Sequence, residues 1–362
     1  MKAGIMTFHT ALNYGAVLQA YALNKTLIDN GVDAEIIDYR APFNEKRFAS
    51  KKVRYFLNIR NLYSVLFCNS YQRHNKQVFD DFINKYLRLS KPIYNQEELG
   101  TMVNLYDKFI VGSDQVWNLA CTESDDSYFL PFINAKSKKN SYAASIGYTQ
   151  FPESERAHYK ALIETFNKIS VREKSAVKAI KEITGRDVSL VLDPTLLLTK
   201  EKWSALFSNE GCRKDKFLLL YLMSEDRVLI QFAKKLAKEK NLKIIYITQR
   251  FFKLSGVINQ RDVSIPQWLS LFHEAEIVVT NSFHGLAFSI NFDKDFFTKY
   301  IPRSIANSRL QTLLDIFDLH YRRIDSDSFN IGKRINTEKN QLKLEALREK
   351  SINFLNEIMN DE

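Results

Sequence analysis

A histidine at a strand-to-helix junction is the sharpest chemical signal in the sequence. The apolar run 277–280 leads straight into a helix predicted at 283–290, so His284 falls in the first helical turn. Free backbone N–H groups and the positive end of the helix dipole favour anions there. A histidine in this place can act as a general acid or base, or donate to an oxyanion. His284 is therefore the first predicted catalytic residue. Its neighbours predicted to bind substrate are Asn281, Ser282 and Gly285.

A second polar loop, 112–118, follows an apolar strand predicted at 108–113. Its carboxylate and amide side chains can bind sugar hydroxyls, and its tryptophan offers an apolar face to a sugar ring. In the structural alternative, Asp114 caps a helix and Trp117 belongs to the core. The functional interpretation is preferred, with Asp114 as a second catalytic candidate. The substrate-binding residues predicted in this loop are Gln115, Trp117 and Asn118.

The loop after the first predicted strand, 2–8, precedes a helix predicted at 16–29. Gly15 permits a close approach to a ligand or a positive φ angle, and the helix start behind it is a natural anion site. A tight turn with a polar cap is the alternative. The side chains that could hydrogen-bond a sugar or phosphate here are His9, Asn13, Tyr14 and Gln19.

Positive charge is predicted to face the same crevice. Arg172 comes immediately after the short strand 168–171, and its planar fork suits a carboxylate or a phosphate. The alternative is a weakly stabilising surface pair with Glu173. Further cations follow downstream, so the ligand is expected to be anionic, with surface solvation as the alternative. These cations are Lys299, Arg303 and Arg309. No metal-ligand spacing occurs in the sequence, and no metal or other cofactor is expected.

These loops must be held by parallel strands, because ligands of open α/β sheets bind at the carboxyl ends of their strands. The predicted strands are 2–8, 34–39, 108–113, 140–145, 168–171, 188–192, 217–223, 242–248, 277–280 and 295–299. The predicted helices are 16–29, 153–166, 225–240, 266–274, 283–290 and 338–359, with another beginning at 172. Alternating strands and helices indicate an α/β fold with two Rossmann-like domains. We expect the arrangement of two-domain, GT-B-like glycosyltransferases.

The domain organisation follows from a polar linker expected at 198–216. Residues 1–200 are predicted to form the first domain, on the acceptor side, and 212–330 the second, on the donor side. Residues 337–362 are predicted to form a terminal helix. A chain of 362 residues is comfortable for two such domains.

Composition narrows the function further. No segment approaches the roughly 18–20 apolar residues that span a bilayer, and the amino terminus does not resemble a signal peptide. A cytoplasmic location is expected. Cys68, Cys121 and Cys212 lack zinc-like spacing, which favours reduced cysteines without a shared role.

The formal net charge of +10 is concentrated between residues 43 and 90, where ten basic residues oppose three acidic ones. Aromatic residues interleave the charges, and the segment is predicted to be a helical insert. Three interpretations of this segment remain, and the most favoured comes first: a solvated helical face, a peripheral contact with anionic lipid at the inner face of the membrane, and nucleic-acid binding. The last lacks any nucleic-acid motif, so no nucleic-acid partner is expected. No oligomeric state is predicted.

Taken together, the motifs resemble the polysaccharide pyruvyl transferase family over about residues 1–320. The matching segments are His9 with 13–15 and 18–23, then 112–118, 141–147, 170–173, 193–195, 281–285, and 308–309 with 313–314. The resemblance implies transfer of a pyruvyl group from phosphoenolpyruvate to a sugar, usually as a cyclic ketal. It also implies a GT-B-like fold and a bacterial capsule, exopolysaccharide or cell-wall glycan as the product, with acceptors that can be lipid-linked.

The resemblance also assigns roles to single residues. Arg172 resembles the anion-binding arginine of the family, and His284 resembles its catalytic histidine. Replacing either by Ala is predicted to abolish transfer and to leave the fold intact. Many family members place an arginine two residues before that histidine, where this chain has Ser282. The candidates to replace that cation are Arg303, Arg309 and Lys299.

Two other functions are weighed beside pyruvyl transfer. A glycosyltransferase using a nucleotide sugar would need a pocket for base and ribose in the second domain, and no clear acidic residue for a ribose is found there. A non-catalytic paralogue that binds a glycan or a membrane is kept open by Ser282. Measurable turnover of phosphoenolpyruvate would exclude the non-catalytic paralogue.

Overall fold

The computed structural model describes residues 1–41, 75–207, 213, 215–248, 253–304 and 307–361. Within them, the strands form two parallel sheets. The first sheet, in the order β2-β1-β3-β4-β5-β6, comprises β1 (Lys2–Met6), β2 (Asp33–Ile36), β3 (Lys108–Val111), β4 (Lys139–Ala144), β5 (Ile169–Val171) and β6 (Ser189–Leu190). The second, in the order β11-β10-β7-β8-β9, comprises β7 (Phe217–Tyr221), β8 (Lys243–Ile247), β9 (Ile258–Gln260), β10 (Ile277–Thr280) and β11 (Asp295–Thr298).

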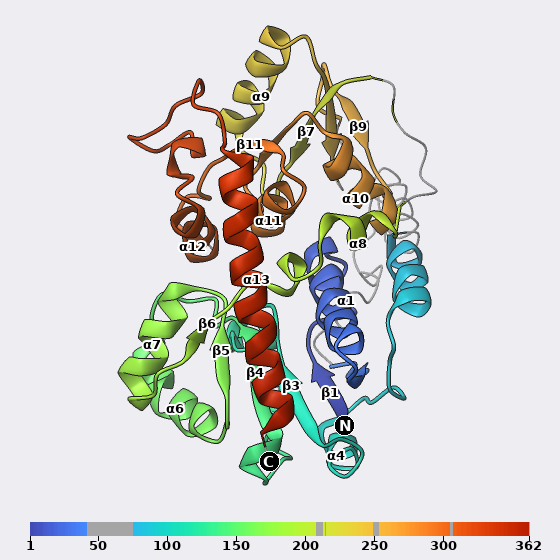
Figure 1. The fold of residues 1–362 in the computed structure, drawn as a ribbon, viewed down its shortest axis with the longest axis vertical. Helices are drawn as coiled ribbons and strands as arrows, with labels where there is room; N and C mark the ends of the chain where they lie inside the picture. The colour runs from blue at the N-terminus through green and yellow to red at the C-terminus, as the bar shows by residue number, and fades with distance from the viewer. Residues whose placement is uncertain (42–74, 208–212, 214, 249–252, 305–306, 362) are drawn as a thin grey trace, which may run out of the picture.

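Helices surround both sheets and form the two-lobed body seen in Figure 1. The longer helices are α1 (Tyr14–Asp29), 75–86, α6 (Arg156–Glu164), α7 (Lys174–Thr184), α9 (Arg227–Glu239), α10 (Ile265–Glu274), α11 (Phe283–Asn291), α12 (Asn307–Phe317) and α13 (Thr337–Asn360). The short helices are α4 (Gln96–Gly100), α5 (Leu119–Thr122), η1 (Asp126–Phe129), η2 (Lys136–Lys138), η3 (Glu153–Glu155), η4 (Pro194–Leu196), α8 (Lys200–Ser204) and η5 (His320–Arg322). Every residue of β3 and β10 is buried, as expected for parallel strands covered on both faces.

Helix α1 joins the two lobes through a shared apolar core. Tyr14, at its first position, stacks on Trp268 of α10 in the carboxyl-terminal lobe, with ring centroids 5.4 Å apart. The Tyr14 hydroxyl also donates to the Val263 carbonyl at 2.6 Å. A single cluster of buried side chains therefore runs from α1 into α10 and α11.

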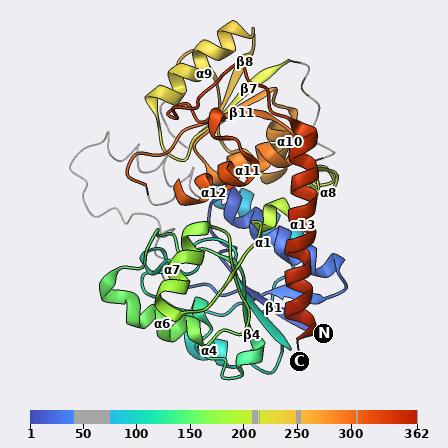
Figure 2. The same ribbon diagram turned by 60° about the vertical axis from the view of Figure 1, so that its left-hand side comes forward.

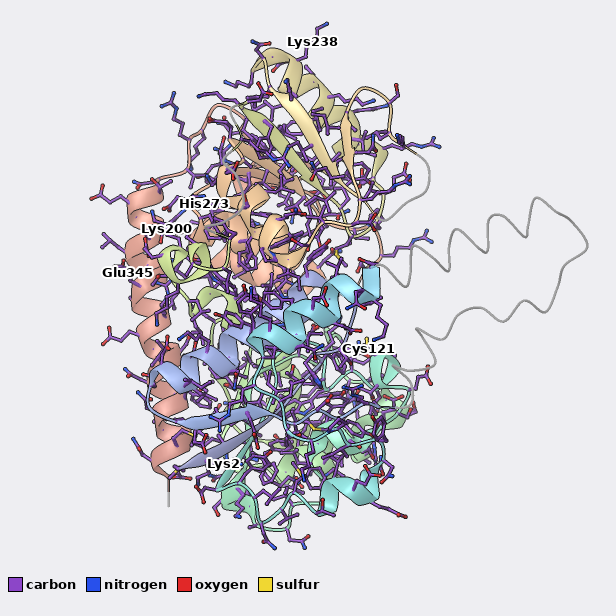
Figure 3. The ribbon with its side chains drawn as sticks, turned by 90° about the vertical axis from the view of Figure 1, so that its right-hand side faces the viewer. Lys2, Cys121, Lys200, Lys238, His273 and Glu345 are labelled. Atoms are coloured by element: carbon purple, nitrogen blue, oxygen red, sulfur yellow. The ribbon has the colours of Figure 1, made fainter. Side chains whose placement is uncertain are left out.

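Helix α13 runs alongside both lobes (Figures 1 and 2). Near its start, Gln341 Nε2 donates to the Ile290 carbonyl of α11 at 2.9 Å. Just beyond its end, the Asp361 carbonyl accepts from Lys108 Nζ of β3 at 2.5 Å. Figure 3 shows that Cys121 lies on the side away from α13, near the level at which the lobes meet.

The α/β class with two parallel sheets and a carboxyl-terminal helix is confirmed. Strand β9 and helix α12 were not predicted, and they are present. The domain limits stay predictions, but the start of the expected linker is packed: Trp203, in α8, is fully buried.

Of the basic segment 43–90, residues 43–74 lie outside the described part of the chain, and 75–86 form a helix as expected. Among the described residues, no helix combines the length and apolar character needed to cross a membrane.

Candidate active site

The carboxyl ends of four strands and helix α12 bring a cluster of charged side chains together between the lobes. Asp114 follows β3, Arg172 and Glu173 follow β5, and Asp193 follows β6. From the other lobe, α11 contributes His284 after β10, and α12 contributes Arg309. We call these six residues the charged cluster. Four of them were predicted site residues.

Arg172 lies at the centre of the charged cluster, with a side chain that is 0% exposed. Its Nη1 donates to Asp193 Oδ2 at 2.7 Å, and its Nη2 donates to Asp114 Oδ1 at 3.0 Å. Glu173 is equally buried, with Oε2 3.9 Å from Arg172 Nε. A buried charge of this kind requires such partners. The alternative of a surface Arg–Glu pair is therefore wrong.

His284 lies against this arrangement and is itself almost fully buried. Its Nε2 is 3.9 Å from Asp193 Oδ2 and has no hydrogen-bond partner among the described residues. Burial lowers the pKa of His284 to about 4; Asp193 and Asp114 oppose the shift, and Arg172 and Arg309 add to it. The imidazole is therefore neutral near pH 7 and can accept a proton.

The pKa of His284 predicts a pH-dependent free energy of unfolding. The imidazole titrates at its ordinary value of 6.5 in the unfolded chain and near 4 in the folded one. Between these values the unfolded state binds more protons, so stability falls as the pH falls through this window. Above pH 6.5 this group contributes no pH dependence.

Urea unfolding at pH 7 and pH 5 measures this effect. Wild type should lose about 1–2 kcal/mol more than His284→Gln over that interval, since one pH unit is worth at most about 1.4 kcal/mol. Equal losses in the two proteins would contradict the lowered pKa.

Gly15 provides the surface on which His284 rests. A Cβ atom at position 15 would lie 1.9 Å from His284 Nδ1. Gly15 sits in the first turn of α1, where Asn13 Oδ1 accepts from its backbone N–H at 2.9 Å. The close approach expected for this glycine is thus made by an imidazole of the other lobe, and no positive φ angle is involved.

Asp114 is the most exposed member of the charged cluster, and Arg309 lies beside it. The side chain of Asp114 is 15% exposed, and its Oδ1 lies 4.0 Å from Arg309 Nη1. Asp114 has a φ angle of 71°, which is uncommon for a residue other than glycine. The preceding Gly112 has a φ angle of 119°, and a Cβ there would meet the Tyr142 carbonyl oxygen at 2.2 Å. Unusual backbone conformations of this kind gather at functional sites.

Arg309 is the downstream cation that joins the charged cluster. Its guanidinium lies 5.8 Å from the centre of the Phe283 ring, beside that of Arg172 at 4.9 Å. Lys299 instead pairs with Asp226 at 2.5 Å. Ser282 brings no charge and caps α11, accepting from the Gly285 N–H at 3.2 Å.

Trp117 does not bind substrate as predicted but belongs to the core. Its side chain is 0% exposed, stacks on Phe129 with centroids 5.5 Å apart, and donates from Nε1 to the Tyr128 carbonyl at 3.2 Å. A ring enclosed in this way offers no face to a sugar. The core alternative is correct, because the loop after β3 turns inward at Val116 and Trp117.

The neighbours of Trp117 brace the same loop. Asn118 caps α5, with Oδ1 accepting from the Ala120 N–H at 3.1 Å, and its Nδ2 donates to Gln115 Oε1 at 3.0 Å. Both side chains pack against Gly147, where an added Cβ would lie 2.3 Å from Asn118 Nδ2. Gln115 remains partly exposed beside Asp114.

Two of the residues predicted to bind substrate, Gln19 and His9, are buried and support the loops of the site through hydrogen bonds. Gln19 is fully buried; its Nε2 donates to Thr7 Oγ1 at 2.9 Å and its Oε1 accepts from the Ser113 N–H at 3.1 Å. It thereby fixes the backbone just before Asp114. His9 is 1% exposed and pairs with Asp38 through a 2.9 Å contact at Nε2.

A cavity of about 210 Å³ opens beside the charged cluster, between the start of α1 and the carboxyl ends of β7 and β8. The predicted residues Asn13 and Tyr14 line it. Asn281 holds its far wall: Oδ1 accepts from the Met223 N–H at 2.8 Å, and Nδ2 donates to the Ser224 carbonyl at 2.9 Å. The loop after β7 is thus tied to the strand end that precedes His284.

Three residues of the site were not predicted from the sequence: Ser113, Glu173 and Asp193. Asp193 carried a usable signal, because an Asp-Pro pair ends a predicted strand and so lies at the same sheet edge. Its Oδ1 accepts from the Thr195 N–H at 3.0 Å, while Oδ2 faces Arg172 and Ser113 Oγ. Within the described ranges, no three His, Cys, Asp or Glu side chains are placed to hold one metal ion.

Comparison with known proteins agrees with this arrangement. The structure resembles the UDP-GlcNAc 2-epimerase of Methanocaldococcus jannaschii in complex with UDP-GlcNAc and UDP, at 12% identity and a TM-score of 0.50, covering 100% of this chain and 94% of that one. The UDP-GlcNAc 2-epimerase of Neisseria meningitidis bound to UDP-GlcNAc is similar, at 12% identity and a TM-score of 0.50, over 98% and 94% of the two chains.

At such low identity these likenesses show a shared GT-B-type fold. No curated protein matches the chain. The sequence model of a family described as polysaccharide pyruvyl transferase matches residues 13–298, a range that contains five of the six residues of the charged cluster. The chain belongs to the polysaccharide pyruvyl transferase family.

Proposed function

We propose that the protein transfers the pyruvyl group of phosphoenolpyruvate to two hydroxyls of a sugar and forms a ketal. The acceptor in this proposal is a sugar of a bacterial surface glycan or of its lipid-linked precursor. Family membership supports a transferase with a pyruvyl donor and a glycan acceptor. Phosphoenolpyruvate as the donor and the kind of acceptor are what the proposal adds.

One observation carries the proposal: a neutral, buried imidazole lies beside two arginines at the junction of the lobes. Phosphoenolpyruvate carries a carboxylate and a phosphate, which guanidinium groups bind well. Arg309, which lies beside the partly exposed Asp114, is assigned to the donor together with Arg172. His284 has an unpartnered Nε2, so a proton can be exchanged there.

The reaction balances without a cofactor. One sugar hydroxyl adds to C2 of phosphoenolpyruvate, and the methylene carbon gains a proton to become a methyl group. The second hydroxyl then displaces the phosphate, which leaves with the remaining proton. His284 is assigned to accept a hydroxyl proton. Asp114, whose side chain is 15% exposed, is assigned to accept the proton of the second hydroxyl.

Release of inorganic phosphate from phosphoenolpyruvate tests the proposal. The purified chain is incubated with a panel of aryl and lipid-linked glycosides, and phosphate is measured with and without each acceptor. Acceptor-dependent release is expected. If no acceptor gives phosphate release, and the protein binds a nucleotide sugar but does not bind phosphoenolpyruvate, glycosyl transfer would be favoured.

The contact between Gly15 and His284 predicts that Gly15, although uncharged itself, is sensitive to substitution. Gly15→Ala should displace the imidazole, because the new Cβ would lie 1.9 Å from Nδ1. We expect a loss of about 1–3 kcal/mol in stability from overpacking, and a fall in kcat of up to about 100-fold from misplacement. Gly100→Ala is the matched control, because a Cβ at that position meets no atom within 4 Å. Equal activities in the two variants would contradict the assigned position of His284.

The basic segment 43–90 belongs to the proposal as a peripheral contact with anionic lipid near a lipid-linked acceptor. In its described part, Lys76 pairs with Asp80 and Arg88 pairs with Asp33. Sedimentation with anionic and neutral vesicles tests this contact. Equal binding to both would argue against it.

A further inference from the structure

The cavity beside the charged cluster differs from that cluster in chemistry. Its lining comes from the start of α1, the loop after β7 and the end of β8. Among the described residues that line it, Glu225 is the single charged side chain. This lining therefore has no cationic side chain that could bind the carboxylate or the phosphate of phosphoenolpyruvate. The donor and this cavity are therefore poorly matched, whereas the arginines of the charged cluster suit the donor.

The same lining suits a neutral polyhydroxylated ring. The lining contains Ser224, Glu225, Thr248 and Tyr246, whose polar groups can meet hydroxyls, together with Asn13, Tyr14 and Tyr221. The Tyr14 hydroxyl already donates to the Val263 carbonyl, and Asn13 Oδ1 accepts from the Gly15 N–H. Leu12, Leu222 and Met223 add apolar surface for the C–H face of a sugar. Pockets that recognise small molecules combine apolar walls with a few polar groups in this way.

The size of the cavity restricts the ligand. Its volume of about 210 Å³ is below the roughly 300–1,000 Å³ of pockets that hold drug-sized molecules. One monosaccharide ring is the expected occupant, with the rest of a longer glycan outside. Met223 and Ser224 are exposed at the rim, where the chain of an acceptor would leave.

The first turn of α1 connects the cavity to the charged cluster. Tyr14 lines the cavity, and the next residue, Gly15, packs against the imidazole of His284. On the opposite wall, Asn281 fixes Met223 and Ser224 and lies three residues before His284. A hydroxyl held in the cavity would therefore lie near the group assigned to accept its proton.

From these observations we propose that the cavity is the acceptor subsite and binds one neutral sugar ring of the glycan. This inference rests on the proposed function for the term acceptor, but the binding of a neutral sugar can be measured without turnover. Glu225 and Asn13 are the residues that would recognise its hydroxyls.

Ser224→Trp tests the inference by filling the rim of the cavity. Ser224 is exposed on a loop, so the substitution should leave the fold intact, as circular dichroism would verify. Ser328→Trp is the matched control, because it places the same bulk on an exposed serine outside the cavity. With an active acceptor, we expect the acceptor KM of Ser224→Trp to rise about tenfold or more, equivalent to about 1.4 kcal/mol. The KM for phosphoenolpyruvate should stay unchanged.

Saturation-transfer NMR with methyl β-glucopyranoside, β-galactopyranoside and β-mannopyranoside provides a readout independent of catalysis. Wild type and Ser328→Trp should transfer saturation to at least one of these glycosides, and Ser224→Trp should not. The inference is overturned if no glycoside binds wild type, if binding survives in Ser224→Trp, or if that variant loses phosphoenolpyruvate instead. Cavity-dependent glycoside binding without any phosphate release would leave the subsite standing and would refute the proposed donor.

Discussion

His284→Ala is expected to lower kcat for pyruvyl transfer by about 10²–10⁴-fold, the usual contribution of a positioned general acid or base. The imidazole is neutral, buried and unpartnered at Nε2, and no other described histidine belongs to the charged cluster. Removing it leaves the hydroxyl proton without its acceptor. The measurement is initial-rate phosphate release with saturating phosphoenolpyruvate and acceptor.

His158→Ala is the matched control for this variant. His158 is half exposed and forms a 3.0 Å surface pair with Asp126, so its loss should leave kcat unchanged. Circular dichroism and the phosphoenolpyruvate KM separate a chemical defect from a folding defect. Wild-type kcat in His284→Ala would remove His284 from the mechanism.

Arg172→Ala is expected to affect both folding and transfer. The sequence alone predicts an intact fold for this variant, but the structure shows a fully buried guanidinium paired with Asp193 and Asp114. Removing one partner of a buried ion pair leaves the other charges uncompensated and costs about 3–5 kcal/mol. Urea unfolding should show that loss, and transfer should disappear. Arg88→Ala, which removes a surface pair with Asp33, should cost about 0–1 kcal/mol.

Arg172→Lys separates the two roles of Arg172. The lysine retains one positive charge among the carboxylates but lacks the planar fork that binds a carboxylate or phosphate through two hydrogen bonds. We expect it to recover part of the stability lost in Arg172→Ala and to keep a raised KM for phosphoenolpyruvate. Full recovery of both quantities would show that only charge is needed at this position.

Although half of the buried strand β4 is polar, the sequence predicted the architecture well because several other buried parallel strands are mostly apolar. The segments 108–111 and 277–280 are examples, and each ends in polar residues that lie at the site. Strand β9 was missed because it has three residues, none fully buried, and so no clear pattern. Helix α12, which carries Arg309, was missed although its buried positions include Leu310, Leu313 and Leu314.

The residues of the site were harder to predict than the strands that carry them. Arg172 and Asp114 meet because their strands end at one edge of the first sheet, which follows from topology, whereas His284 and Arg309 reach them from the other lobe. Trp117 follows the same strand end, yet it points into the core, since loop direction cannot be read from residue type. The contact of Gly15 with His284 and the cavity beside it arise only when the two lobes pack together.

The central claim is transfer of a pyruvyl group from phosphoenolpyruvate by the charged cluster. The most direct measurement uses phosphoenolpyruvate labelled with ¹³C at C2, with the product analysed by NMR and mass spectrometry. We expect wild type to yield an acceptor that gains one pyruvate less one water, with the labelled carbon in a ketal, and His284→Ala to yield no such product. Unchanged acceptor with intact phosphoenolpyruvate, or equal product from wild type and His284→Ala, would contradict this claim.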